Sequence, residues 1–401
     1  MTDAPISLSL ALPTAKPEDV GLSPAGLARL EAAMQREVDS ARVPGVAMLI
    51  ARRGKVAWRA NVGALRPGGP ALRDDGIFRI YSMTKPVVSV AIMMLVEEGR
   101  LFIADPLAKF IPEFADVQVG VERNGKLELV PPERPITIQD LLRHTSGLTY
   151  AFTGTSAVQR LYGEALLRSP GIDGAAFVVA LAKLPLINQP GASWDYSHST
   201  DVVGRVVEIV AGQTLGAFLQ ERIFGPLAMN DTGFFAPAEK HERLAEGFPI
   251  DPDTGAPVKL TDPRVAPKFE SGGGGLVSTI EDYARFVQML SLGGALNGVR
   301  ILGRKTIAYM ASDHLGPQVR NATPSLLPPG HGFGLGFAVR RETGMAPTPG
   351  TPGEFFWGGL AGTAFWIAPQ EELFAIMMIQ ALGQRDYYRQ LFRNLVHAAL
   401  A

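Results

Sequence analysis

The first part of the chain carries one helical pattern of apolar residues and then two strand patterns. Ser23 and the proline after it are typical of a helix N-terminus, and apolar residues at helical spacing predict an amphipathic helix over 24–40. Two apolar runs, 46–52 and 55–63, flank a short turn and predict a β-hairpin. The last part of the chain again shows strand patterns and then a helical one, at 333–340, 354–357, 362–368, 373–380 and 385–400.

The middle of the chain shows helical patterns punctuated by prolines, at 138–144, 173–183, 201–211 and 214–223. A further helix, 281–290, is expected to open at a capping box that starts at Ser278. Strands at both ends with helices between them predict an α+β fold, in which helices flank one antiparallel sheet and a mainly helical segment is inserted. We expect a sheet domain formed by 1–112 and 226–401 and a helical domain formed by 113–225.

Ser82 precedes a stretch that is apolar on nearly every face, which predicts a helix buried at the centre of the fold. Lys85 follows one turn later, so both side chains would share a helix face. Burial would lower the pKa of Lys85 and favour a neutral amine able to take the hydroxyl proton of Ser82. The alternative is that Ser82 caps the helix and Lys85 is solvated, because this spacing alone is a weak motif.

A second candidate segment lies between a proline–glycine turn and a predicted helix, and it contains Tyr196 and His198. A phenol can transfer a proton when a nearby cation lowers its pKa, and Lys85 is the candidate cation. The commoner use of a single tyrosine is to close a loop with one hydrogen bond. His198 either lines the same pocket or is an ordinary loop histidine.

Composition narrows the chemistry further. The 401 residues include no cysteine, so a covalent enzyme must use another nucleophile. With 46% hydrophobic residues the chain can form a large core, which excludes a disordered protein. Lysine and arginine number 38 against 39 acidic residues, which argues against nucleic-acid binding and electrostatic membrane anchoring. The six histidines show no metal-ligand spacing, so we expect neither a metal nor another cofactor.

Two apolar segments bear on location. The run 86–96 is far shorter than the ~20 residues of a membrane helix. The segment 6–13 resembles a short signal sequence, but the first basic residue, Lys16, follows it instead of preceding it. We therefore expect a cytoplasmic protein with no membrane partner.

Three ordered motifs resemble those of the family VIII carboxylesterases, which are serine esterases on the scaffold of class C β-lactamases and DD-peptidases. The motifs are Ser82-Met83-Thr84-Lys85, Tyr196-Ser197 and Trp357-Gly358-Gly359. The stretches 140–148, 226–229 and 271–276 are similar too, and the resemblance runs from about Val20 to the C-terminal helix.

The resemblance implies a role for each matching residue. Ser82 would be the acylated nucleophile, Lys85 its base or the group that tunes the base, and Tyr196 the general base and acid. The backbone N–H groups of Ser82 and Leu360 would form the oxyanion hole. The remaining expected contacts to substrate are Tyr81, His198, Trp357, Gly358 and Gly359.

Two departures from the β-lactamase pattern favour an esterase. Those enzymes have Tyr-x-Asn and Lys-Thr-Gly, whereas His198 and Trp357 stand in the corresponding places here. An apolar wall at Trp357 in place of a lysine favours neutral, apolar acyl esters. We expect a small-molecule ester of short to medium acyl length to bind in a cleft between the two domains. A β-lactamase, an amidohydrolase or an acyltransferase using the same acyl-enzyme stays open, as does a catalytically silent scaffold that binds a partner.

Overall fold

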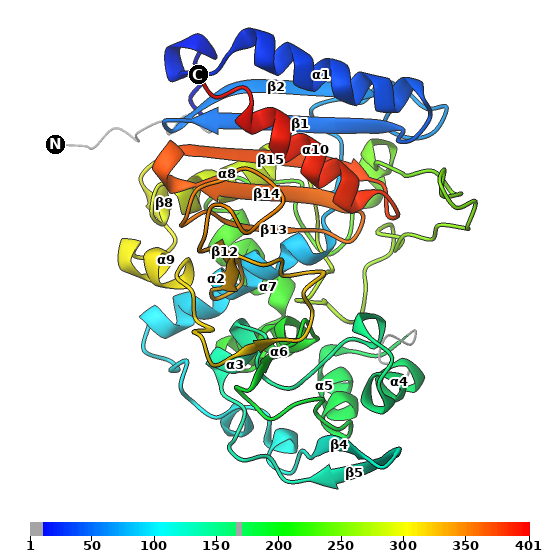
Figure 1. Cartoon of the computed structure of the whole chain (residues 1–401). Coiled ribbons are helices and arrows are strands. Elements are labelled where there is room, and N and C mark those ends of the chain that lie inside the picture. Colours follow the sequence, from blue (N-terminus) through cyan, green and yellow to red (C-terminus); the bar gives the residue numbers. More distant parts are fainter. Residues whose placement is uncertain (1–10, 166–170) are drawn as a thin grey trace, which may run out of the picture.

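The computed structural model describes residues 11–165 and 171–401 (Figure 1). Its centre is a seven-stranded antiparallel sheet in the order β11-β12-β13-β14-β15-β1-β2. Both chain ends contribute to it, because β1 lies between β2 and β15 and pairs with each. The strands are β1 (Gly45–Arg52), β2 (Lys55–Gly63), β11 (His331–Phe333), β12 (Ala338–Arg340), β13 (Phe355–Gly358), β14 (Gly362–Ala368) and β15 (Leu373–Gln380). This arrangement confirms the predicted antiparallel sheet.

Helices cover both faces of the sheet because successive side chains of a strand point to opposite sides. Along β1, Met48 and its neighbours two residues away pack with α1 (Pro24–Asp39) and α10 (Arg385–His397). The alternate residues, such as Leu49, belong to the larger core that contains α2 (Thr84–Glu97) and α8 (Ile280–Ser291). Figure 1 shows α1 and α10 together at the end of the molecule that holds β1 and β2.

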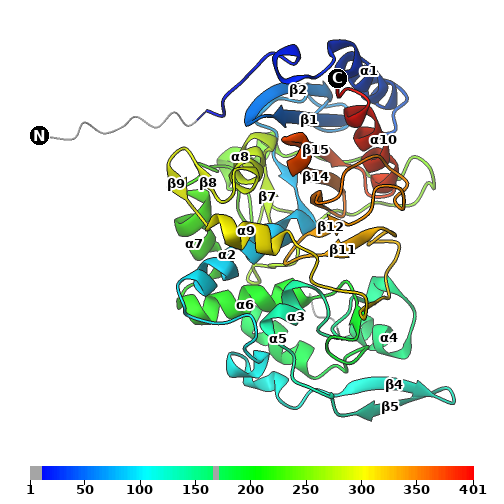
Figure 2. The same cartoon turned by 60° about the vertical axis from the view of Figure 1, so that its left-hand side comes forward.

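Most helices of the middle segment lie on the far side of α2 from the sheet (Figure 2). They are α3 (Ile138–Leu142), α4 (Ala157–Glu164), α5 (Gly174–Ala182) and α6 (Ser199–Ala211), whereas α7 (Leu215–Leu219) lies beside α2. A hairpin of β4 (Val119–Arg123) and β5 (Lys126–Val130) projects from this region. The domain boundaries at 112/113 and 225/226 stay a prediction.

The structure corrects three predicted elements. The expected strand 333–340 is a hairpin, since Gly334 N–H donates to the Phe337 carbonyl at 2.8 Å and the chain reverses there. The cap of α8 is Thr279, whose hydroxyl accepts from Asp282 N–H at 3.1 Å, and not Ser278. The α-helix within the expected range 214–223 ends at Leu219, and the chain then forms a π-helical turn over Gln220–Phe224.

Several further short elements, which the sequence did not predict, complete the fold. They are α9 (Arg304–Met310), β3 (Phe78–Arg79) paired with β7 (Val277–Ser278), β6 (Ser193–Trp194) paired with β10 (Arg320–Asn321), and β8 (Ala295–Leu296) paired with β9 (Val299–Arg300).

Among residues 11–165 and 171–401, no single helix is long and apolar enough to cross a membrane. One pair bent by 79°, Ser199–Ala211 with Leu215–Phe224, meets the length and composition criteria only when its two helices are taken together. The signal-like segment 6–13 lies mostly outside the described residues, and the cytoplasmic location stays a prediction.

Candidate active site

Ser82 lies in a 3-10 turn, Tyr81–Met83, that leads directly into α2. Tyr81 has a φ of +43°, a left-handed conformation that turns the chain sharply just before the serine. Ile80 N–H donates to the Leu276 carbonyl at 3.1 Å and ties this turn to the glycine-rich segment. The first ten residues of α2 after its N-cap are almost completely buried, as its apolar sequence predicted.

Lys85 is 1% exposed, which excludes the solvated alternative. Its Nζ lies 3.4 Å from Ser82 Oγ, 3.2 Å from Tyr150 Oη and 2.7 Å from the Gly273 carbonyl oxygen. Three oxygens therefore surround an ammonium group that has three protons to donate.

The charge of Lys85 differs from the sequence-based expectation. Burial alone lowers its pKa, but the side chains of Tyr150, Tyr196 and Asp201 raise it more, so the pKa of Lys85 lies above its usual value. The predicted neutral amine is therefore wrong, because the prediction counted desolvation without the oxygens that the fold places around Nζ. With Lys85 charged, another group has to accept the proton of Ser82.

Tyr196 faces this ammonium group. Lys85 Nζ lies 4.5 Å from the centre of the Tyr196 ring. The centre of the Trp357 ring lies 5.3 Å from the centre of the same Tyr196 ring. Within the described parts of the chain, the buried Tyr196 hydroxyl makes no hydrogen bond to the loop around it, and it interacts with Lys85, whose pKa it raises. It does not close a loop by a hydrogen bond, which removes the structural alternative and leaves an oxygen able to exchange a proton.

Tyr150 is a site residue that sequence reasoning missed. Its hydroxyl accepts from Lys85, and its ring packs 4.2 Å from the ring of His198. Tyr150 stands two residues after the stretch 140–148 that the family resemblance singled out, so its proximity to that stretch was the available signal.

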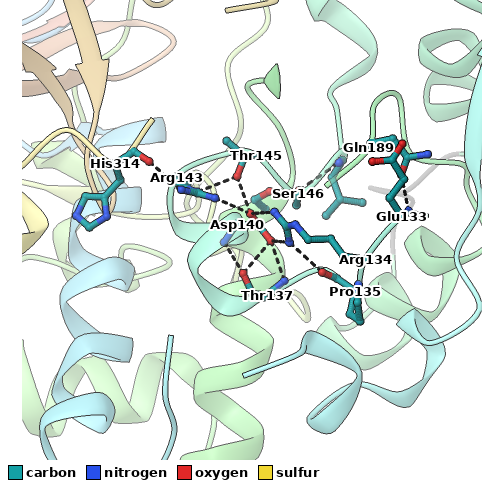
Figure 3. Close-up of polar contacts among 12 residues, drawn as sticks. Glu133, Arg134, Pro135, Thr137, Asp140, Arg143, Thr145, Ser146, Gln189 and His314 are labelled. Carbon is teal, nitrogen blue, oxygen red and sulfur yellow. Dashed lines mark hydrogen bonds and ion pairs between the residues drawn. The ribbon is translucent and has the colours of Figure 1, made fainter. Parts of the chain in front are cut away.

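The loop that carries Tyr150 is held by a buried carboxylate. Figure 3 shows Asp140 at the centre of hydrogen bonds from Arg134, Thr137, Arg143 and Thr145. Burial raises the pKa of Asp140, but these donors lower it by more than burial raises it, so the pKa lies at about 2. Asp140 is therefore ionised and fixes the start of the loop that presents Tyr150 to Lys85.

His198 lines the site and is fixed by Asp201, whose Oδ2 lies 3.0 Å from His198 Nδ1. Asp201 also accepts from Ser271 Oγ at 2.5 Å and from Gly273 N–H at 2.9 Å. A Cβ on Gly273 would lie 2.8 Å from the Asp201 carboxylate, so only glycine fits there. Gly273 is thus bound on both sides, since its N–H donates to Asp201 and its carbonyl accepts from Lys85.

The end of β13 and the turn that follows it place Trp357, Gly358, Gly359 and Leu360 in the wall of the cavity that Ser82 lines. Thr363 Oγ1 donates to the Ile80 carbonyl at 3.4 Å. A Cβ on Gly359 would lie only 2.4 Å from that carbonyl oxygen, so the turn touches the segment that ends in Ser82. The two backbone groups expected to form the oxyanion hole therefore belong to segments in direct contact.

These residues open onto a cavity of about 1220 Å³. Its walls include the predicted residues Tyr81, Ser82, Tyr196, His198 and 357–360, whereas Lys85 is buried behind them. Both predicted domains contribute walls. Apolar and aromatic residues that also line it are Tyr150, Phe152, Tyr162, Ile172, Phe234, Val265, Phe269 and Leu326. Charged residues line it as well, namely Arg79, Asp262, Lys268, Arg385, Arg389 and Arg393. A concave site with an apolar wall and a few polar groups suits a small organic substrate.

Within 11–165 and 171–401, no cluster of three or more histidine, aspartate or glutamate residues is placed to hold a metal ion.

Comparison with known proteins agrees with this geometry. Residues 30–400 match the family described as Beta-lactamase. The chain is 30% identical over 366 residues to Esterase EstB of Burkholderia gladioli, covering 85% of this chain and 86% of that protein. It is 28% identical over 379 residues to Acyltransferase calJ of Penicillium decumbens, covering 84% and 87%.

Among solved structures, EstCE1, a hydrolase with promiscuous acyltransferase activity, is similar with a TM-score of 0.78 at 26% identity. The match covers 93% of this chain and 98% of that one. The chain therefore belongs to the beta-lactamase family, and within it to the family VIII carboxylesterases, as a serine hydrolase of carboxylic esters.

Proposed function

We propose that the protein hydrolyses small esters of short to medium acyl length through an acyl-enzyme on Ser82. The observation that carries this proposal is the position of the Lys85 ammonium group, 3.4 Å from Ser82 Oγ and beside two phenols, at the wall of an apolar cavity. A hydroxyl nucleophile, a fixed cation and a phenolic oxygen are together sufficient for acyl transfer without a metal or cofactor.

Catalysis requires Tyr196 with its hydroxyl deprotonated. In the first step, Ser82 Oγ bonds to the ester carbonyl carbon and its proton passes to the oxygen of Tyr196, beside the fixed positive charge of Lys85. The backbone N–H groups of Ser82 and Leu360 hold the oxyanion of the tetrahedral intermediate. When the intermediate collapses, the bond to the alcohol oxygen breaks and Tyr196 returns the proton to the departing alcohol.

In the second step, water replaces the alcohol. Tyr196 takes a proton from water as the water oxygen bonds to the acyl carbon. The bond to Ser82 Oγ then breaks, Oγ recovers the proton from Tyr196, and the carboxylic acid leaves. Charged Lys85 is in this scheme the group that tunes the base, and Tyr196 is the base itself.

The substrate class follows from the cavity walls. Trp357 occupies the place where related β-lactamases carry a lysine, and its buried ring packs against Tyr196 and Phe333. Trp357 itself therefore offers no charge to a substrate carboxylate, and the basic residues Arg385, Arg389 and Arg393 line other parts of the same cavity. His198, Tyr81 and the backbone of 358–359 complete the surface that would contact the ester.

The test is the rate on a series of p-nitrophenyl esters from acetate to palmitate, measured beside nitrocefin. We expect the highest kcat/KM on short and medium chains, and a fall of about 10⁴-fold or more in Ser82→Ala. Ser89→Ala is the control, because Ser89 is a buried serine of α2, 1% exposed, and its hydroxyl has no hydrogen-bond partner in the described structure. Faster turnover of nitrocefin than of any ester, or a wild-type rate in Ser82→Ala, would contradict the proposal.

A further inference from the structure

Arg389 of α10 contacts the turn between β13 and β14 on the carbonyl side of Gly359, and it also lines the cavity. Its Nη2 donates to the Gly359 carbonyl and, at 3.2 Å, to the Thr363 carbonyl. A Cβ on Gly358 would lie 2.5 Å from the same nitrogen, so the guanidinium rests directly on the backbone of the turn.

The same turn is closed by its own backbone. Gly362 N–H donates to the Gly359 carbonyl at 3.0 Å, and Gly359 N–H donates to the Thr363 carbonyl at 2.8 Å. The Gly359 carbonyl therefore accepts from two donors, one in the turn and one on Arg389. A carbonyl oxygen has two lone pairs, so its orientation is fully determined.

The Gly359 carbonyl and the Leu360 N–H belong to one peptide plane. In a trans peptide these two groups point in opposite directions, and the plane is rigid. Holding the carbonyl toward α10 and the interior of the turn therefore aims the Leu360 N–H outward. Leu360 lines the cavity that Ser82 also lines, and a Cβ on Gly359 would lie 2.4 Å from the Ile80 carbonyl oxygen, so this peptide lies beside the segment that ends in Ser82.

We propose that Arg389 is a positioning residue for the oxyanion hole, which orients and polarises the Gly359–Leu360 peptide from its carbonyl side. This inference rests on the proposed acyl-enzyme and goes beyond it by assigning a function to a residue that does not touch the substrate carbonyl.

The charge of Arg389 adds to its geometry. Its acidic neighbour is Asp386, 3.6 Å away and 68% exposed, and an exposed pair of this kind contributes little. Asp386 therefore neutralises little of the guanidinium charge, which acts on the two carbonyls and also interacts with Tyr196. A cation on a peptide oxygen strengthens the N–H of the same peptide as a donor, because hydrogen bonds in a chain polarise one another.

The chain offers a matched control in Arg52. Its guanidinium also rests on two backbone carbonyls, those of Gly21 at 2.6 Å and Glu371 at 3.0 Å. Glu371 follows the end of β14 opposite to the turn at Gly359, so Arg52 lies away from the site. Removing either arginine costs backbone hydrogen bonds, but only Arg389 acts on the Leu360 peptide.

The experiment compares Arg389→Ala, Arg389→Lys and Arg52→Ala with p-nitrophenyl butyrate as substrate and phenylboronic acid as a tetrahedral inhibitor. Losing one oxyanion donor costs ~10²–10³ in kcat, so misorienting it in Arg389→Ala should lower kcat about 10- to 100-fold with KM nearly unchanged. The affinity for the boronic acid should fall by a similar factor. Millimolar guanidinium should restore much of kcat, and Arg389→Lys should lie in between, since an ammonium group does not reproduce the planar donor fork.

Three results would overturn the inference. One is a kcat in Arg389→Ala within twofold of wild type, with a loss of thermal stability like that of Arg52→Ala. The second is boronic acid affinity that stays unchanged while kcat falls. The third is a rise in KM confined to esters with a free carboxylate, such as mono-p-nitrophenyl succinate, which would make Arg389 a substrate-binding group. Labelling of wild-type Ser82 by a fluorophosphonate tests the proposed function separately, because it does not depend on Arg389.

Discussion

Gly359→Ala is expected to slow the enzyme by pushing its two oxyanion segments apart. A Cβ at this position would lie 2.4 Å from the Ile80 carbonyl oxygen and 2.2 Å from Thr363 Oγ1. Ordinary contact begins near 3.4 Å, so the turn has to move by about 1 Å from the segment that ends in Ser82. Gly359 is not among the glycines with positive φ, so the effect is steric and not a backbone restriction.

A misplacement of 1 Å in an active site costs about 10²-fold in rate. We therefore expect kcat on p-nitrophenyl butyrate to fall by about 30- to 100-fold in Gly359→Ala. Overpacking should lower the free energy of unfolding by about 1–3 kcal/mol, which a thermal melt measures.

Gly344→Ala is the matched control for this substitution, because nothing lies within 4 Å of a Cβ there and its φ is not positive. It should match the wild type in both kcat and melting temperature. If Gly359→Ala keeps a kcat within threefold of wild type, the close contact between the turn and the Ser82 segment does not set the oxyanion geometry.

Two further substitutions test Tyr150, which contacts Lys85, and Asp140, which holds the loop that carries Tyr150. Tyr150→Phe removes one of the oxygens that raise the pKa of Lys85, so the alkaline limb of the kcat/KM–pH profile should move to lower pH, and an unchanged limb would refute this coupling. Asp140→Asn should lower the free energy of unfolding by about 2–4 kcal/mol at pH 7, because burial raises the pKa of Asp140 but Arg134 and Thr137 lower it to about 2. Since the folded pKa lies below the unfolded value of 3.8, this stabilisation is present above pH 4 and is lost as the pH falls toward 2. Urea unfolding of both proteins at several pH values measures the difference, and a difference that does not change with pH would contradict the assignment.

Most of the sheet could be predicted because its strands are bounded by turns and carry uninterrupted apolar runs. The predicted bounds of 55–63, 362–368 and 373–380 match β2, β14 and β15. The strand 333–340 was wrong because Gly334 and Gly336 lie inside an otherwise apolar run, and a tight turn over 334–337 replaces four positions of the expected strand. Apolar content alone does not distinguish one strand from a short hairpin.

The site shows the same division between local and long-range information. Ser82 and Lys85 are one helical turn apart, so their contact follows from local geometry. The charge of Lys85 depends on Tyr150, Asp201 and Gly273, which are 65 or more residues away in sequence, so it could not be predicted. Arg389 was missed for the same reason, since its partners are backbone carbonyls and carry no sequence signature.

Covalent labelling tests directly whether Ser82 is the acylated nucleophile. The protein is treated with a fluorophosphonate, and the modified peptide is located by tandem mass spectrometry in the wild type, Ser82→Ala and Ser89→Ala. We expect a single adduct on Ser82 in the wild type and in Ser89→Ala, and none in Ser82→Ala. An adduct on another residue, or no adduct on an enzyme that hydrolyses p-nitrophenyl butyrate, would contradict the acyl-enzyme on Ser82.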